Sequence, residues 1–301
     1  MAIVLPTSKI QPTETEPRVL VIFSKPKSGK STALSLLDNN LILDTEKGTA
    51  YIEALKVDVS SVKDILEVCK QVKAAGCPYK YITLDTLTSL EEILQPYALS
   101  LWKKSNAYNP EKNPEQLKIT DVYSLPFGLG QKYMRDSYLA VIGLLQQVCK
   151  RIILVCHSKD AKINENELTI KDIDLAGKLS DIIASRYDGA GYLYRDINDN
   201  TIITFDIKQL AAECKCRVPR LDGKKFVLIE NRDGKLIPHW DRIYSSEPYS
   251  GEDVVTTPQI NVTDILDEKE FNEEDQSENS NISEEESEEE SEVDKLSNIE
   301  L

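Results

Sequence analysis

Histidine and cysteine are scarce in this sequence, and their scarcity limits the metal and redox chemistry available to it. The 301 residues include two His and six Cys. Cys214 and Cys216 are separated by one residue, a spacing that fits neither a zinc knuckle nor a thioredoxin-type redox pair. Four of the six fall in or beside apolar patterns, so we expect free, buried thiols in a reducing compartment.

Long apolar runs are also absent. No stretch of eighteen apolar residues occurs, which argues against a membrane-spanning helix. Residues 1–17 lack the basic start and the continuous apolar core of a secretory signal, so we expect a cytoplasmic protein. Apolar residues nonetheless make up 41% of the chain, which is enough to build a substantial core.

Basic residues are almost missing from the C-terminal end. Residues 264–301 hold 17 Asp and Glu against two Lys, and their net charge of −15 equals that of the whole chain. Residues 1–263 are therefore charge-balanced. The acidic segment has almost no aromatic residues and a dense like charge, so we predict a disordered tail.

The remaining pattern predicts an α/β protein with a mostly parallel central sheet. Strand patterns at 19–23, 41–46, 79–85 and 151–157 alternate with helix patterns at 31–37, 61–75, 87–103 and 132–150. Hairpin patterns after residue 189 add antiparallel strands at the end of the sheet. We predict an arm at 1–17, a folded domain at 18–245 with a polar insertion or lid at 105–130, and a linker and tail at 246–301.

The turn after the first strand has the pattern of a phosphate-binding loop. The segment RVLVIFSKPKSGKST, residues 18–32, reads as strand, turn and helix. Backbone N–H groups of such a loop face phosphates, Lys30 would contact the β- and γ-phosphates, and Ser31 would bind Mg²⁺. Ser24 occupies the first Gly position of G-x-x-x-x-G-K-[ST], where a left-handed turn would strain it. The alternative is a Lys/Ser-rich surface turn before an amphipathic helix.

Two strand ends carry carboxylates that a nucleotide-hydrolysing site needs. Glu46 follows the second strand and is our candidate to orient a water for attack on the γ-phosphate. Asp85 ends the 79–85 strand, which we expect beside the phosphate-loop strand, and is our candidate to hold Mg²⁺. The alternatives are a solvated loop acid at Glu46 and a helix cap at Thr86, which is compatible with the metal role of Asp85.

Polar residues on two later strands complete the candidate site. His157 closes the 151–157 strand and is a candidate sensor of the γ-phosphate, the alternative being a structural histidine. Lys215 and Arg217 would share one face of a strand and could reach phosphates bound by a neighbouring subunit. The alternative is a basic surface strand or a nucleic-acid-facing patch.

The order of these elements resembles that of RecA-like recombinase cores. Over roughly residues 18–230, the chain is most similar to the short, core-only RecA-like ATPases of bacteriophages that promote single-strand annealing. The resemblance implies ATP and Mg²⁺ as cofactors, a homo-oligomer, and ATP hydrolysis stimulated by single-stranded DNA in recombination, annealing or replication. A phage-encoded protein would work in the host cytoplasm. Two departures are Ser24 for Gly and His157 where bacterial recombinases carry Gln.

Carried over position by position, the resemblance implies a role for each candidate residue. Glu46 would be the catalytic base, Asp85 and Ser31 would lie at the metal, and His157 would sense the γ-phosphate. Lys215 and Arg217 would act across a subunit interface. The nucleotide would be contacted by Ser24, Lys25, Pro26, Lys27, Ser28, Gly29, Lys30, Ser31 and Thr32.

A bound single strand would need basic and aromatic residues on loops. We predict that the 105–130 insertion and the residues just before it form this DNA-binding loop. The candidates are Lys103, Lys104, Tyr108, Lys112, Lys118 and Tyr123. The acidic tail would mimic DNA in the protein's own basic groove, recruit a partner such as a single-strand-binding protein, or serve solubility alone. If it mimics DNA, deleting residues 264–301 tightens DNA binding.

Two other functions fit a phosphate-binding loop. One is a P-loop small-molecule kinase, which should carry an Arg-rich lid. Arg135, Arg151 and Arg186 are the arginines in the middle of the chain, and they do not cluster. The other is a nucleotide-gated scaffold such as a helicase loader. Hydrolysis stimulated by single-stranded DNA separates the leading hypothesis from both.

Overall fold

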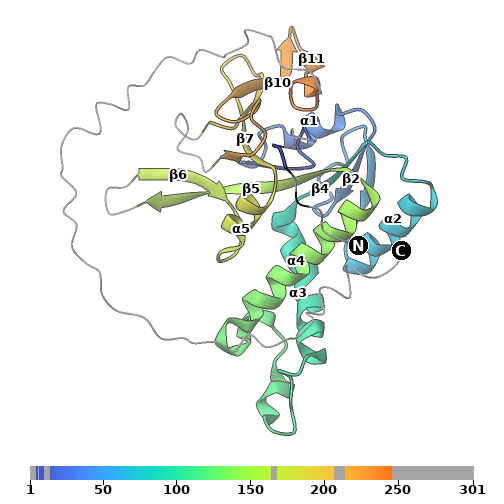
Figure 1. Ribbon diagram of the computed structural model, residues 1–301, viewed down its shortest axis with the longest axis vertical. Coiled ribbons are helices and arrows are strands. Elements are labelled where there is room, and N and C mark those ends of the chain that lie inside the picture. Colours follow the sequence, from blue (N-terminus) through green and yellow to red (C-terminus); the bar gives the residue numbers. More distant parts are fainter. Residues whose placement is uncertain (1–4, 6, 10–13, 164–167, 207–213, 246–301) are drawn as a thin grey trace, which may run out of the picture.

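The computed structural model describes residues 5, 7–9, 14–163, 168–206 and 214–245, and the predicted acidic tail lies outside them (Figure 1). An 11-stranded sheet has the order β11-β10-β8-β7-β1-β5-β4-β2-β3, with β6 paired to β5 and β9 paired to β7. The strands are β1 (Val19–Ser24), β2 (Asn40–Asp44), β3 (Leu55–Asp58), β4 (Tyr81–Asp85), β5 (Arg151–Ile163), β6 (Leu168–Ile173), β7 (Gly189–Arg195), β8 (Thr201–Thr204), β9 (Lys215–Cys216), β10 (Lys225–Arg232) and β11 (Lys235–Pro238). The α-helices are α1 (Lys30–Ser35), α2 (Val62–Ala74), α3 (Leu87–Lys104), α4 (Leu129–Val148) and α5 (Leu179–Arg186).

The sheet confirms the predicted α/β architecture. Strands β7, β1, β5, β4, β2 and β3 run parallel, and β8, β10 and β11 add antiparallel pairings at one end. All six residues of β1 are buried, as expected for a parallel strand covered on both faces. Val19, Val21 and Phe23 pack with α2 to α5, whereas Leu20 and Ile22 pack with α1 and the C-terminal residues.

Local signals in the sequence predict most of the helices. Ser61 caps α2 by accepting a hydrogen bond from the Asp64 N–H, and α3 ends one residue beyond its predicted end. The described helices include none long and apolar enough to cross a bilayer. All six cysteines are free, and the expected burial of the thiols holds at Cys69, Cys149, Cys156 and Cys214 but not at the exposed Cys77 or the half-buried Cys216.

Two predictions about the strands are wrong. β4 does not lie beside β1, because β5 is inserted between them and pairs with both. β5 does not end at His157 but continues to Ile163 and pairs antiparallel with β6. The edge strand β3 and the two-stranded extension of β5 and β6 were not predicted, because neither carries a continuous apolar run.

The 105–130 insertion is built of short helical turns rather than an open loop. Three 3₁₀ helices span η1 (Pro114–Lys118), η2 (Val122–Ser124) and η3 (Pro126–Gly128). The insertion lies at the ends of α3 and α4 that are farthest from the sheet (Figure 1). The ring of Tyr108 packs edge-on against the buried Trp102, with ring centroids 4.9 Å apart. This tyrosine therefore contributes to the packing of the hydrophobic core.

The last described residues pack against the helix of the phosphate-binding loop. Trp240, in the 3₁₀ turn η4 (Trp240–Arg242), donates its indole N–H to the Ala33 carbonyl of α1 at 2.9 Å. The Tyr244 ring lies 4.7 Å from that of Tyr81, centroid to centroid. The C-terminal segment therefore supports the face of the sheet that carries α1.

Candidate functional site

The phosphate-binding loop follows β1 directly. Ser24 is the buried last residue of β1, and the left-handed conformations lie further on, at Lys27 (φ 63°) and Gly29 (φ 94°). The strain expected at Ser24 is therefore absent, because the strand continues through it and the chain turns later. A Cβ at Gly29 would lie 3.2 Å from Nη2 of Arg195, so both the backbone angle and the space favour glycine.

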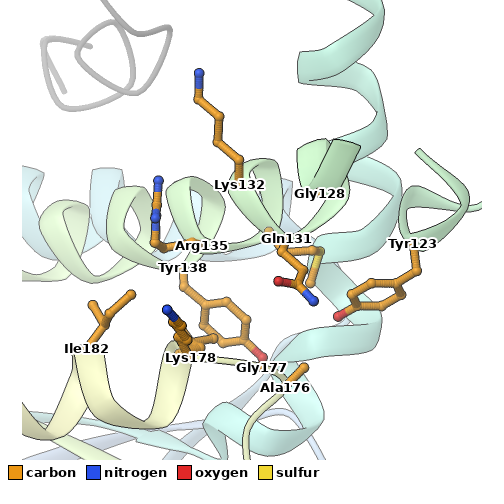
Figure 2. Close-up of a pocket in the computed structure, with 12 residues that line it drawn as sticks. Tyr123, Gly128, Gln131, Lys132, Arg135, Tyr138, Ala176, Gly177, Lys178 and Ile182 are labelled. Atoms are coloured by element: carbon orange, nitrogen blue, oxygen red, sulfur yellow. The ribbon is translucent and has the colours of Figure 1, made fainter. Parts of the chain in front are cut away.

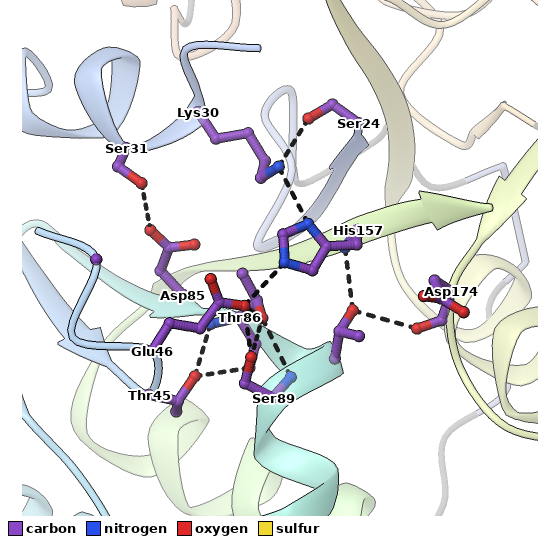
Figure 3. A network of polar contacts seen from close by, with 12 residues as sticks. Ser24, Lys30, Ser31, Thr45, Glu46, Asp85, Thr86, Ser89, His157 and Asp174 are labelled. Carbon is purple, nitrogen blue, oxygen red and sulfur yellow. Dashed lines mark hydrogen bonds and ion pairs between the residues drawn. The ribbon is translucent and has the colours of Figure 1, made fainter. Parts of the chain in front are cut away.

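Lys30 is buried at the centre of the loop. Its Nζ donates to Ser24 Oγ at 3.0 Å and to the Lys25 carbonyl at 3.2 Å, and it lies 3.5 Å from Nδ1 of His157 (Figure 3). Burial lowers the pKa of Lys30, against the opposing effects of the Asp85 and Glu46 carboxylates. The ammonium thus donates to two neutral acceptors of the loop, and an incoming phosphate would give it an anionic partner.

Ser31, at the start of α1, and Asp85, at the end of β4, meet although β5 lies between β1 and β4 in the sheet. The Ser31 hydroxyl donates to Asp85 Oδ2 at 2.9 Å, and burial raises the pKa of Asp85 to about 6. A hydroxyl and a carboxylate are oxygen ligands of the kind that Mg²⁺ uses beside nucleotide phosphates, so this pair fits the predicted metal. The described residues contain no cluster of three or more His, Cys, Asp or Glu that would make an all-protein cage.

Glu46 lies at the same edge of the sheet. Its Oε1 accepts hydrogen bonds from the hydroxyls of Thr86, at 2.6 Å, and Ser89, and it lies 2.9 Å from Nε2 of His157. Burial alone would raise the pKa of Glu46, but the hydrogen bonds from Ser89, Thr86 and His157 outweigh it and lower the pKa. The carboxyl group is therefore held in its ionised form.

Asp44, which the sequence analysis did not single out, shapes the loop that carries Glu46. This buried carboxylate accepts from the backbone N–H groups of Glu46 at 2.9 Å, Gly48 at 3.3 Å and Thr49 at 2.9 Å, and from the Thr49 hydroxyl at 2.6 Å. Burial alone would raise its pKa, but these hydrogen bonds lower it overall. An acid at the end of a strand, followed by Gly and Thr within five residues, is the signal for such a turn.

The His157 ring lies between Lys30 of the phosphate-binding loop and Glu46. Its ring reaches Lys30 with Nδ1 and Glu46 with Nε2 (Figure 3). Its backbone N–H donates to Thr88 Oγ1 at 3.0 Å, and the same hydroxyl lies 3.2 Å from the Asp174 carbonyl, beyond the end of β6. The ring position suits the predicted sensor, since one imidazole separates the loop lysine from the candidate base.

Lys215 and Arg217 lie away from this cluster. β9 pairs with Gly189 and Ala190 at the start of β7, whereas the phosphate-binding loop begins at the opposite end of the neighbouring β1. The Arg217 guanidinium donates to the Ser185 carbonyl. The chain does not bring this pair to its own phosphate-binding loop.

A second concave surface lies between α4 and the turn before α5. This cavity of about 260 Å³ is lined by Lys132, Arg135 and Lys178 but by no carboxylate. Figure 2 shows Tyr138 and Gln131 between α4 and the Ala176–Lys178 turn, with Lys132 extending outward from α4. We call this surface the α4–α5 cleft.

An exposed aromatic residue lies beside the α4–α5 cleft. Phe127, immediately before the lining residue Gly128, is fully exposed and adopts a left-handed conformation with φ 56°. A bulky side chain seldom adopts that conformation, and such outliers cluster at functional sites.

Comparison with known proteins identifies the family to which the chain belongs. No curated protein matches the chain. Among solved structures, the crystal structure of the RadB recombinase is similar, with a TM-score of 0.37 and 11% sequence identity, over 74% of this chain and 91% of that one. The sequence profile of the AAA domain matches residues 16–225, which is more than half of the chain. The chain belongs to the AAA domain family.

Proposed function

We propose that this protein is a RecA-like ATPase that uses ATP and Mg²⁺ and acts on single-stranded DNA in recombination, annealing or replication of the bacteriophage type. The observation that supports it best is the convergence of Lys30, Ser31, Asp85, Glu46 and His157 at one edge of the sheet. A loop cation, a metal-binding pair, a base and a polar residue between them are the parts that γ-phosphate hydrolysis needs.

Each residue has one task in this proposal. The loop from Ser24 to Thr32 binds the phosphates, and Lys30 exchanges its neutral partners for their oxygens. Mg²⁺ held by Ser31 and Asp85 would neutralise charge on the β- and γ-phosphates. Glu46 orients the attacking water, and His157 contacts the γ-phosphate from its place between Lys30 and Glu46.

The α4–α5 cleft is our proposed site for the DNA backbone. Its three cations face no lining carboxylate, and phosphate neutralisation dominates the binding of nucleic acids. The exposed ring of Phe127 offers a surface on which a base can stack. Arg135 is paired with Asp136, but among the described residues Lys132 and Lys178 form no ion pair. At the tip of the insertion, Lys118 is paired with Glu115 and Tyr108 packs into the core, so the cleft fits this role better.

The place of Arg217 supports the proposed homo-oligomer. This residue lies at the end of β7 remote from its own phosphate-binding loop, so any contact with a nucleotide phosphate would be made to a second copy of the chain. Lys215 precedes it by two residues and would act with it.

ATP hydrolysis with and without single-stranded DNA tests the proposal. We expect turnover that DNA stimulates and that Lys30→Ala abolishes, since Lys30 is the cation at the centre of the loop. Lys9→Ala, at an exposed position near the N-terminus, is the control and should leave turnover unchanged. Turnover indifferent to DNA would favour the small-molecule kinase, and nucleotide binding without turnover would favour the scaffold.

A further inference from the structure

Glu46 is held by one of its two carboxylate oxygens. Oε1 receives the Thr86 hydroxyl at 2.6 Å and the Ser89 hydroxyl, and it lies 2.9 Å from Nε2 of His157. Within the described part of the chain, no group donates to Oε2. A carboxylate anchored through one oxygen presents the other in a fixed direction, where a water molecule can bind.

The Ser89 hydroxyl is not needed to start α3. Thr86 is the N-cap of this helix, and its Oγ1 accepts the Ser89 backbone N–H at 3.2 Å. The Thr86 backbone N–H is itself satisfied by Thr45 Oγ1 at 2.8 Å, so no side chain of the first turn has to reach back to it. Removal of the Ser89 hydroxyl leaves these capping bonds in place.

The number of hydroxyl protons also leaves the Ser89 hydroxyl free to donate to Glu46. Each hydroxyl carries one proton. Thr86 Oγ1 accepts from the Ser89 N–H and donates its proton to Glu46, so the Ser89 proton is free to point at Glu46 as well. The 3.1 Å approach of the two hydroxyl oxygens then follows from their sharing one acceptor. Figure 3 shows both residues beside the Glu46 carboxylate, at the start of α3.

We propose that Ser89 is a positioning residue for hydrolysis, which together with Thr86 fixes Oε1 of Glu46 so that Oε2 is aimed at the attacking water. This inference rests on the proposed ATPase function and adds a residue that acts only through Glu46. In the reaction, the water oxygen bonds to the γ-phosphorus and the bond to the β,γ-bridging oxygen breaks. The water proton passes to Glu46 and then to solvent, giving ADP and phosphate.

The test compares turnover with nucleotide affinity. Ser89→Ala should lower kcat about tenfold, since one hydrogen bond that orients the base is lost, and should leave the Kd for ADP unchanged. Ser89→Thr keeps a hydroxyl and should restore most of the turnover. Ser100→Ala is the matched control, because Ser100 is also half-buried on α3 but, within the described residues, its hydroxyl donates to the Tyr97 carbonyl of its own helix and to no group of the site.

A double variant separates positioning from a general loss of structure. In a Glu46→Ala background, Ser89→Ala should cause no further loss of turnover, because the group that it orients is gone. Full turnover in Ser89→Ala, a parallel loss of ADP affinity, or additive losses in the double variant would each overturn the positioning role while leaving the ATPase proposal standing. A wild-type protein that binds nucleotide without hydrolysing it would overturn both.

Discussion

The Ser31 hydroxyl donates a hydrogen bond to the Asp85 carboxylate at 2.9 Å, beyond the end of β5, a strand that contains neither residue. Ser31 follows β1, Asp85 ends β4, and β5 lies between these strands in the sheet. Because the carboxyl ends of parallel strands share one edge, residues on strands that do not touch can still meet beyond it. The pair needs no direct pairing of β1 with β4, which is the arrangement that the sequence analysis assumed.

Replacement of Asp85 should lower the Mg²⁺-dependent turnover of ATP. Asp85→Asn is expected to lower hydrolysis by roughly 10²-fold or more, because a neutral amide stabilises the cation and the developing phosphate charge poorly. Measuring turnover against Mg²⁺ concentration checks this. Asp58→Asn is the control, since Asp58 ends the edge strand β3 of the same sheet and is exposed. Equal Mg²⁺ curves for wild type and Asp85→Asn would rule out the metal role.

Asp44 should give the protein an acid-sensitive stability. Its folded pKa lies below the ordinary value of 3.8, so its stabilisation is complete above that pH and is lost as the pH falls through the lower, folded pKa. Asp44→Asn should cost about 1–3 kcal/mol at pH 7, because it loses a charged acceptor of several hydrogen bonds. Denaturant unfolding at pH 7, 4 and 3 should show the two proteins converging at the lowest pH. A constant difference would contradict the assignment.

Two glycines should respond to alanine in opposite directions. Gly29→Ala places a Cβ in a left-handed conformation and against Arg195, so we expect a loss of about 1–2 kcal/mol and weaker nucleotide binding. Gly143 lies inside α4, where an added Cβ would meet no atom within 4 Å, so Gly143→Ala should stabilise by about 0.5–1 kcal/mol. Thermal unfolding and ADP titration measure both. Equal tolerance of the two changes would show that the loop does not require glycine.

Mixing experiments should reveal whether Arg217 acts on a neighbour. Arg217→Ala and Lys30→Ala should each be inactive alone, because they damage different halves of a shared site. Mixed in equal amounts, they should regain part of the wild-type turnover, since some interfaces then combine an intact loop with an intact Arg217. Lys30→Ala mixed with Ser31→Ala is the control and should regain none. A mixture without recovery would contradict a role of Arg217 across the subunit interface.

Substitutions in the α4–α5 cleft and of the adjacent Phe127 should weaken DNA binding more than those at the tip of the insertion. Lys132→Ala with Lys178→Ala should lower affinity for a single strand and flatten its salt dependence, because two phosphate contacts are lost. Phe127→Ala should cost about 1–3 kcal/mol of binding if a base stacks on the ring. Leu117→Ala, at an exposed apolar position in η1, is the control. Fluorescence anisotropy at several salt concentrations measures all of them, and unchanged binding would exclude the cleft.

The phosphate-binding loop was predictable because its signals are contiguous. A buried apolar strand, a glycine and the Lys-Ser pair lie within a few residues, and the carboxylates at 46 and 85 follow strands of the same kind. The sheet order was not predictable, since no residue pattern within β4 or β5 indicates which of the two strands pairs with β1. The order is settled by how helices of given length pack on the two faces.

The residues that hold Glu46 in place could not be predicted from the sequence. Ser and Thr are common, and Ser89 meets Glu46 only because α3 begins at the edge where β2 and β4 end. The edge strand β3 was missed because Leu55, Lys56 and Asp58 are exposed and the segment lacks an apolar run. A short exposed strand of this kind is defined by its partner β2 and by little in its own residues.

The contact of Trp240 with α1 has a consequence for the acidic end of the chain. This contact and the packing of Tyr244 against Tyr81 fix the point from which residues 246–301 start. If the acidic segment competes with DNA for the folded domain, it does so as an intramolecular ligand, at an effective concentration set by the length of the tether and independent of dilution. Competition between the acidic segment and DNA would therefore depend on the DNA concentration alone, and adding the same segment as a free peptide would reproduce it only at far higher concentration.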